Sequence, residues 1–271
     1  GEDVRAAQLA LIRAGTLAGE ADGVFGPVTR AAVQAFQRRE RLAADGVLTP
    51  ELWRRLMASP ALLRETPWKE ALRPFIVIEG EAAPRRSPGQ PRTAASTWAM
   101  HRAALEAAAQ RFAVPVELLV ATACTESGGR AAAVREEPGF ISDRETPHRV
   151  SPGLMQTLIS TAREALGEPG LDRAALLDPL TSAMAGAAYI RRQARGGRLP
   201  TGYDPPLVAI AYNAGSLRPN RDATDPWGLV QTRRGSGAWH ADSFVAFLGD
   251  ALAVLRDQPP HEATPCFGAM F

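Results

Sequence analysis

A stretch rich in proline and arginine divides the chain into two parts of unequal length. Residues 83–92 contain three prolines and three arginines. Such a composition disfavours helix and packs poorly, so it is typical of a linker. The total of 271 residues also exceeds the usual size of one domain. We therefore expect a small domain over residues 1–60, a linker over residues 61–95 and a larger domain over residues 96–271.

The first part has the residue spacing of three short helices between residues 3 and 58. An Asp-Gly pair stands before the second and the third helix, at residues 22–23 and 45–46, and the two halves form a weak internal repeat. Thr49 and Pro50 are a good N-cap and first residue for the third helix. On the second helix, positions i, i+3, i+4 and i+7 predict one buried face, which carries Thr29, Ala32, Val33 and Phe36.

Beyond the linker, helical patterns dominate and strand signals are sparse. This pattern predicts a mainly α domain. The expected helices cover residues 97–111, 115–126, 179–194, 205–213 and 241–256.

Glu126 stands at the end of an apolar helix. Its neighbours on the same side, three, four, seven and eight residues earlier, are Ala123, Thr122, Leu119 and Leu118. The carboxylate is therefore expected to emerge from a buried face. A carboxyl group that is removed from water keeps its proton to higher pH and can serve as a general acid. The alternative is a glutamate that simply reaches solvent at a helix C-terminus, and position alone favours this alternative.

Two further blocks follow Glu126 in the chain. Residues 153–156 read Gly-Leu-Met-Gln, and residues 211–215 read Ala-Tyr-Asn-Ala-Gly. Together with Glu126 and Ser127, and in this order, the blocks resemble the catalytic domain of the soluble lytic transglycosylase family. That family shares the lysozyme-like fold with goose-type lysozymes. Between the two blocks, residues 177–179, Gly186 and Tyr189 resemble the family's intervening helix. The whole similarity covers about residues 100–216.

The resemblance implies a role for each matching residue. Glu126 would protonate the glycosidic oxygen between N-acetylmuramic acid and N-acetylglucosamine, and its carboxylate would then take the proton of the muramic hydroxymethyl group. Met155 has a core position as its alternative, and Ser127 and Ser151 have turn or capping roles as theirs. The implied substrate-binding residues are Ser127, Ser151, Met155, Gln156, Tyr212 and Asn213.

A second carboxylate separates transglycosylase from hydrolase. Goose-type lysozymes have an aspartate just after their Gly-Leu-Met-Gln block, whereas this chain has Thr157, Leu158 and Ile159. The resemblance therefore favours a lytic transglycosylase, with a hydrolytic muramidase as the alternative. A non-catalytic wall-binding protein is the other alternative. The long segment 130–150 keeps the muramidase open, since it carries Glu136, Glu137, Asp143 and Glu145.

The N-terminal part resembles the three-helix peptidoglycan-binding domain that accompanies many wall-active enzymes. The resemblance implies a modular enzyme whose first domain holds the wall and whose second domain cuts glycan strands. Which surface residues would touch the wall stays open. The matching residues are Val4, Gln8, Asp22 to Gly26, Thr29, Ala32, Val33, Phe36, Gln37, Asp45 and Gly46.

Charge and cysteines exclude several other classes of protein. The net charge is only +2, from 31 basic and 29 acidic residues, so we expect neither a nucleic-acid nor a membrane-surface partner. No apolar run of about twenty residues exists to span a membrane. Cys124 and Cys266 lack metal-ligand spacing, and we expect no metal and no cofactor. Whether these two cysteines pair is left open, with unpaired cysteines favoured. The expected partner is the peptidoglycan glycan strand, and we expect a monomer.

The expected place of action is the bacterial cell wall, reached from the periplasm, from outside the cell, or from the host cytoplasm in the case of a phage lysin. The chain opens at Gly1 without a visible leader. This feature and the two-domain layout favour a phage or prophage endolysin over a remodelling enzyme, and both origins stay open.

Overall fold

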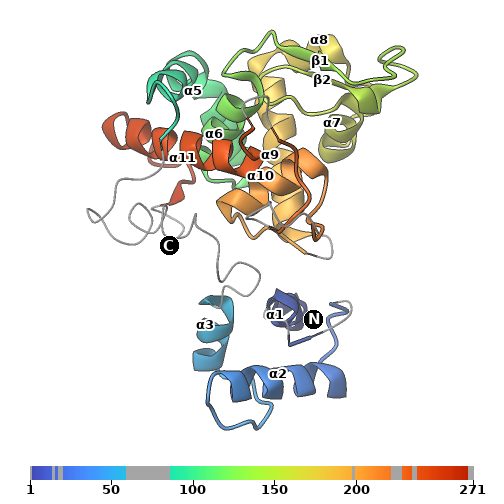
Figure 1. The fold of residues 1–271 in the computed structure, drawn as a ribbon, viewed down its shortest axis with the longest axis vertical. Helices are drawn as coiled ribbons and strands as arrows, with labels where there is room; N and C mark the ends of the chain where they lie inside the picture. The colour runs from blue at the N-terminus through green and yellow to red at the C-terminus, as the bar shows by residue number, and fades with distance from the viewer. Residues whose placement is uncertain are drawn as a thin grey trace. The chain divides into compact units, whose positions relative to one another are not determined.

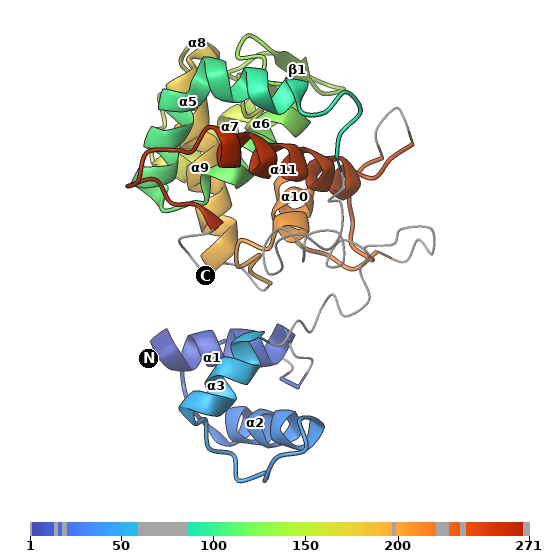
Figure 2. The same ribbon diagram turned by 90° about the vertical axis from the view of Figure 1, so that its left-hand side faces the viewer.

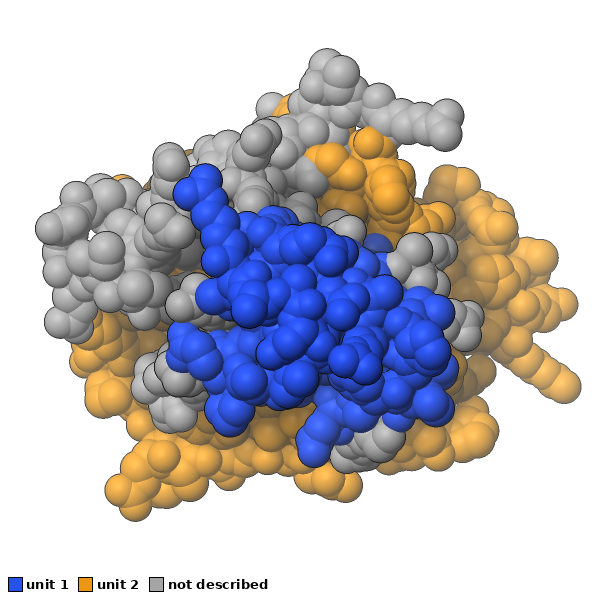
Figure 3. Space-filling model, turned by 90° about the horizontal axis from the view of Figure 1, so that it is seen from below, with its two compact units in different colours: residues 1–66, 196–200 blue, residues 67–195, 201–271 orange. Residues whose placement is uncertain are grey.

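The chain forms two compact units in the computed structural model, which describes residues 2–13, 16–17, 21–58, 86–196, 199–220, 228–233 and 237–267. One unit comprises Gly1–Thr66 with Gly196–Pro200, and the other comprises Pro67–Arg195 with Thr201–Phe271 (Figures 1 and 3). Both consist mainly of helices, as predicted from the sequence. Most of the predicted linker, residues 61–85, lies outside the described residues. The proposed domain limits at residues 60 and 95 therefore stay predictions.

The first unit contains three helices: α1 (Glu2–Arg13), α2 (Pro27–Arg39) and α3 (Pro50–Ala58). The predicted face of α2 is buried, and Phe36 is fully enclosed. At the start of α3, Thr49 Oγ1 accepts a hydrogen bond from the Leu52 amide at 3.2 Å, as an N-cap residue should. The core consists of Ala10, Leu11, Leu17, Ala32, Val33, Phe36, Leu52 and Leu56.

The internal repeat seen in the sequence is also a repeat of hydrogen bonds. Two glutamines each bridge one Asp-Gly turn: the side-chain nitrogen donates to the aspartate, and the side-chain oxygen accepts from the glycine amide. The distances are 2.7 and 2.8 Å for Gln8 with Asp22 and Gly23, and 2.6 and 2.8 Å for Gln37 with Asp45 and Gly46. Each turn is thus attached to a helix through an amide side chain.

The second unit is built around α6 (Val116–Ser127). Every residue of α6 except Glu126 is buried. Its neighbours are α5 (Arg92–Phe112), α9 (Pro179–Arg195) and α11 (His240–Asp257), and the two ribbon views show them around it (Figures 1 and 2). α5 begins at Arg92 rather than at the expected residue 97, so residues 92–95 of the predicted linker are helical.

A buried carboxyl group holds the C-terminal segment against the start of α6. Glu117 accepts hydrogen bonds from the Phe267 amide at 3.1 and 3.2 Å. Burial raises the pKa of Glu117 to about 7. The Val116 amide donates to the Pro265 carbonyl at 2.9 Å, so backbone and side chain fix the same segment.

The second unit also contains a small sheet and several shorter helices. Strands β1 (Val134–Glu136) and β2 (Val150–Pro152) pair antiparallel, with Arg135 opposite Ser151. The sequence did not predict this small sheet, because three-residue strands are too short to show an alternating pattern. No helix among the described residues is long and apolar enough to cross a membrane. The remaining elements are η1 (Pro147–Arg149), α7 (Ile159–Leu166), α8 (Arg173–Leu177) and α10 (Pro205–Ala214).

Glycine allows the Gly-Leu-Met-Gln block to pass close to its neighbours. Gly153 has a φ of +86°, and a Cβ atom on it would lie 1.9 Å from the Leu176 carbonyl oxygen. The Met155 amide donates to Ser182 Oγ of α9 at 3.0 Å. Ser127 Oγ, at the end of α6, donates to the Leu154 carbonyl at 2.7 Å. The block is therefore fixed between α6, α8 and α9.

We predict that Gly153→Ala destabilises the second unit by about 2 kcal/mol or more, because it combines a left-handed backbone with an overlap against backbone. Urea unfolding measures the effect. Gly170→Ala is the matched control, since no atom lies within 4 Å of its added Cβ, and its effect should stay within about 0.5 kcal/mol. Equal stability of the two variants would show that the close approach at Gly153 is not a constraint.

Candidate active site

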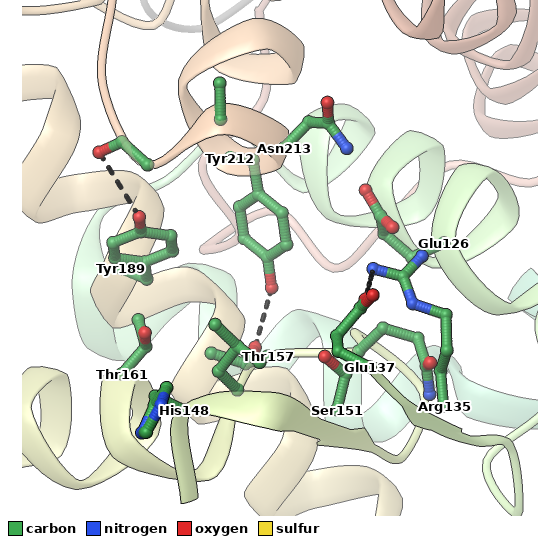
Figure 4. Close-up of a pocket in the computed structure, with 14 residues that line it drawn as sticks. Glu126, Arg135, Glu137, His148, Ser151, Thr157, Thr161, Tyr189, Tyr212 and Asn213 are labelled. Atoms are coloured by element: carbon green, nitrogen blue, oxygen red, sulfur yellow. Dashed lines mark hydrogen bonds and ion pairs between the residues drawn. The ribbon is translucent and has the colours of Figure 1, made fainter. Parts of the chain in front are cut away.

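A cavity of about 320 Å³ in the second unit brings together most of the residues predicted for the site. Its walls come from the end of α6, the small sheet, the residues after β2, and α9 and α10 (Figure 4). Five of the predicted site residues line it, namely Glu126, Ser151, Gln156, Tyr212 and Asn213. The other lining residues are Arg135, Glu137, His148, Thr157, Leu158, Thr161, Tyr189, Ala214 and Gly215.

Glu126 lies in the last turn of α6, and its side chain is 10% exposed. The helix ends directly after it, because Gly128 has a φ of +65° and its amide donates to the Cys124 carbonyl at 3.1 Å. Gly129 follows where a Cβ atom would overlap Thr97 Oγ1 at 2.1 Å. The expectation of a carboxylate that emerges from a buried helix is therefore correct.

Tyr212 joins α10 to the Gly-Leu-Met-Gln block. Its hydroxyl donates to the Met155 carbonyl at 3.0 Å and lies 2.6 Å from Thr157 Oγ1. The Tyr189 ring lies 5.3 Å away, tilted by 59°. Burial holds the pKa of Tyr212 far above its usual range, so the hydroxyl stays uncharged. Tyr212 thus holds the Gly-Leu-Met-Gln block in the cavity wall, and the side chain that lines the cavity is uncharged.

Gln156 and Asn213 each use one end of the amide to hold backbone. Gln156 Nε2 donates to the carbonyls of Ala133 and Gly153, both at 2.9 Å. Asn213 Oδ1 accepts from the Thr232 amide at 3.0 Å and from the Thr232 hydroxyl at 3.1 Å. Within the described residues, Gln156 Oε1 and Asn213 Nδ2 have no hydrogen-bond partner. Since both residues line the cavity, these ends can bind hydroxyl or acetamido groups.

Of the three predicted residues not yet described, Met155 and Ser127 do not line this cavity, whereas Ser151 does. Met155 is fully buried and packs against Gly186, so the core alternative describes it and no side-chain contact with a ligand is open to it. Ser127 is also buried, and its hydroxyl donates to the Ala123 and Leu154 carbonyls at 3.0 and 2.7 Å. Ser151 faces the cavity from β2.

Of the four acidic residues of segment 130–150, only Glu137 lines the cavity. Arg135 Nη2 lies 2.7 Å from Glu137 Oε1, and Figure 4 shows both side chains reaching toward the region of Glu126. The others bind elsewhere: Arg173 Nη2 lies 2.8 Å from Glu136 Oε1 and 2.7 Å from Asp143 Oδ1, while the exposed Glu145 accepts a hydrogen bond from Ser142 at 3.0 Å.

His240 is a site residue that sequence reasoning missed. It is the first residue of α11, and its Nε2 lies 3.1 Å from Glu126 Oε1. The predicted helix began one residue later, and a contact between residues 126 and 240 leaves no local pattern in the sequence. No motif in one sequence could have indicated it.

A second cavity, of about 540 Å³, shares Glu126 with the first. It is formed by the end of α6, the start of α11 and the segment before α5. Asp250 of α11 is fully buried and fixes that segment, because it accepts hydrogen bonds from Arg86 and Ser87. Glu126 is thus reached from two cavities of the same unit.

No group of His, Cys, Asp and Glu side chains within the described ranges could hold a metal ion. Cys124 is buried in α6 and Cys266 is half-buried, and both are free thiols.

Two family models match the chain. Residues 1–56 match the model described as a putative peptidoglycan binding domain, and residues 103–226 match the model described as a Transglycosylase SLT domain. A comparison with curated proteins found no match. The second match contains Glu126, the Gly-Leu-Met-Gln block and Tyr212. Both resemblances drawn from the sequence are therefore confirmed.

Proposed function

Because the chain joins a peptidoglycan-binding domain to a lytic transglycosylase domain, we propose that it cleaves peptidoglycan between N-acetylmuramic acid and N-acetylglucosamine with Glu126 as acid and base. The observation that carries the proposal is the placement of Glu126. It is the one residue of α6 that is not buried, and it lies between two cavities that a glycan strand could occupy on either side of the cleaved bond.

The reaction needs two proton transfers, one from Glu126 and one back to it. Glu126 donates its proton to the glycosidic oxygen, the bond from the muramic C1 to that oxygen breaks, and the N-acetylglucosamine side leaves as an alcohol. The muramic C6 hydroxyl then bonds to C1, and its proton passes to the Glu126 carboxylate. The products are a 1,6-anhydro end and an enzyme restored to its starting state, and no water is consumed.

The surroundings of Glu126 suit a substrate that is neutral at its sugar rings. Tyr212 and Thr157 supply uncharged hydroxyl groups, and Gln156 and Asn213 supply free amide ends. The muramic acetamido group can stabilise the positive charge that develops at C1, as in other substrate-assisted glycosidases. A nucleophilic carboxylate is then unnecessary.

A hydrolytic muramidase is a second candidate, and Glu137 is the observation that favours it. This carboxylate lines the same cavity as Glu126 and could activate a water molecule as an inverting enzyme requires. The Arg135 guanidinium lies 2.7 Å from Glu137 Oε1 and already engages this carboxylate, which argues against that role.

The first unit contributes attachment. A domain that holds an insoluble polymer raises the local concentration of the catalytic unit over its substrate. The action is at the cell wall, which both family matches imply.

We predict that Glu126→Gln lowers glycan cleavage by roughly 10²- to 10⁴-fold, because the amide cannot donate the proton. Clearance of a suspension of purified cell walls measures the loss, and a thermal melt checks that the fold is kept. Glu145→Gln is the control, since Glu145 is exposed and does not line the cavity. A Glu126→Gln variant as active as this control would remove Glu126 from the mechanism.

We predict that the wild-type products end in anhydro-muramic acid. Digestion in water enriched in heavy oxygen, followed by mass spectrometry, should show muramic ends lighter by one water and without label. Glu137→Gln should leave this product pattern unchanged. Labelled reducing ends that disappear in Glu137→Gln would instead establish hydrolysis with Glu137 as the base.

We predict that residues 1–60 fold in isolation and bind peptidoglycan, because their core and both bridged turns lie within the segment. Circular dichroism tests the fold, and sedimentation with purified sacculi tests binding. Cellulose is the control polymer. A folded segment that stays in the supernatant while the full chain sediments would contradict the assignment.

A further inference from the structure

The imidazole of His240 lies within ion-pair distance of Glu126, and nothing in the proposed reaction uses it. Both side chains are nearly enclosed, with 5% of His240 and 10% of Glu126 exposed. The 3.1 Å between Nε2 and Oε1 is an ion-pair distance, yet Nε2 makes no hydrogen bond within the described part of the chain. A buried ring nitrogen without a partner is unusual and calls for an explanation.

Two packed helices hold this pair, one residue at the C-terminal end of α6 and the other at the N-terminal end of α11. Glu126 belongs to the last turn of α6, which the glycine cap ends, and His240 begins α11, which packs against α6. The His240 amide donates to the Thr232 carbonyl at 3.1 Å, which holds the start of α11. The two groups therefore cannot move apart without disturbing the core.

We propose that His240 is a positioning residue that pairs, as an imidazolium, with the ionised Glu126 carboxylate between the two proton transfers. The inference rests on the proposed role of Glu126. After the first transfer, a negative charge stands in a nearly enclosed place, where a lone charge is costly. A positive imidazole 3.1 Å away offsets that cost, and the contact directs one carboxylate oxygen away from the substrate.

The other ionisable groups around the pair leave this role to His240. The Cys124 thiol is uncharged, since burial raises its pKa to about 12, and Tyr212 is uncharged for the same reason. Arg135 and Glu137 pair with each other. The further groups are His148 and Tyr189 at the first cavity, Arg130 and Asp242 at the second, Asp250 of α11 with its partner Arg86 from the segment before α5, and His101 of α5, whose ring contacts the Gly129 carbonyl.

The pairing has a defined effect on the pH profile. A positive charge beside Glu126 favours loss of its proton, so activity that needs the protonated acid falls at a lower pH than it would without the charge. Removing the charge should therefore move the alkaline limb of kcat/KM to higher pH.

The first experiment compares pH profiles of kcat/KM on soluble, uncross-linked glycan strands. His240→Gln keeps a polar group near Glu126 without the charge, and its alkaline limb should lie at higher pH than that of the wild type. His261→Gln is the control, since His261 is exposed and lines neither cavity, and its limb should not move. A His240→Gln profile that differs from the wild type only by a constant factor would overturn the proposal and leave a packing role.

The second experiment does not depend on cleavage and remains decisive if His240→Gln folds poorly. The His240 ring is titrated by NMR in the wild type and in Glu126→Gln, because coupling between two sites is reciprocal. Loss of the carboxylate should lower the midpoint of the His240 titration. Equal midpoints would overturn the pairing. If the midpoint shifts but the Glu126→Gln enzyme remains active, the pairing is supported and the proposed role of Glu126 as the acid is wrong.

Discussion

The complete enclosure of α6 is the constraint on which the second unit depends. A helix that is buried on every side can present a polar side chain only where it ends, and α6 ends at Gly128, two residues after Glu126. Its neighbours α5, α9 and α11 must therefore approach closely along its length while leaving this end open. The two cavities that share Glu126 lie at this one opening. The packing that buries α6 therefore also determines where the Glu126 carboxylate lies.

Much of the helical architecture could be predicted from the sequence because helical periodicity is local. The buried face of α2 follows from residue spacing, and the start of α3 follows from Thr49 and Pro50. Glu126 could be singled out because an apolar helix ends at it. The two later blocks supply other residues that line the same cavity. The start of α5 at Arg92 was missed, since prolines and arginines mask helical spacing there.

The rest of the site depends on contacts between distant residues. The small sheet pairs residues 134–136 with 150–152, and neither strand is long enough to show a period. Four acidic residues of one segment were equivalent in the sequence, and ion pairs with Arg173 draw two of them away from the cavity. Met155 and Gln156 are adjacent, yet one is core and the other lines the cavity. His240 has no sequence signal because its partner lies more than a hundred residues earlier.

The hydrogen bonds of Arg86 and Ser87 to the buried Asp250 give the second unit a defined point of mechanical attachment. If the preceding chain is pulled, the load reaches α11 through Asp250 before it reaches the first turn of α5 at Arg92. α11 begins at His240, so tension along the chain would act on the helix whose first residue contacts Glu126. The second unit is thereby anchored at a fully buried group rather than at a surface loop.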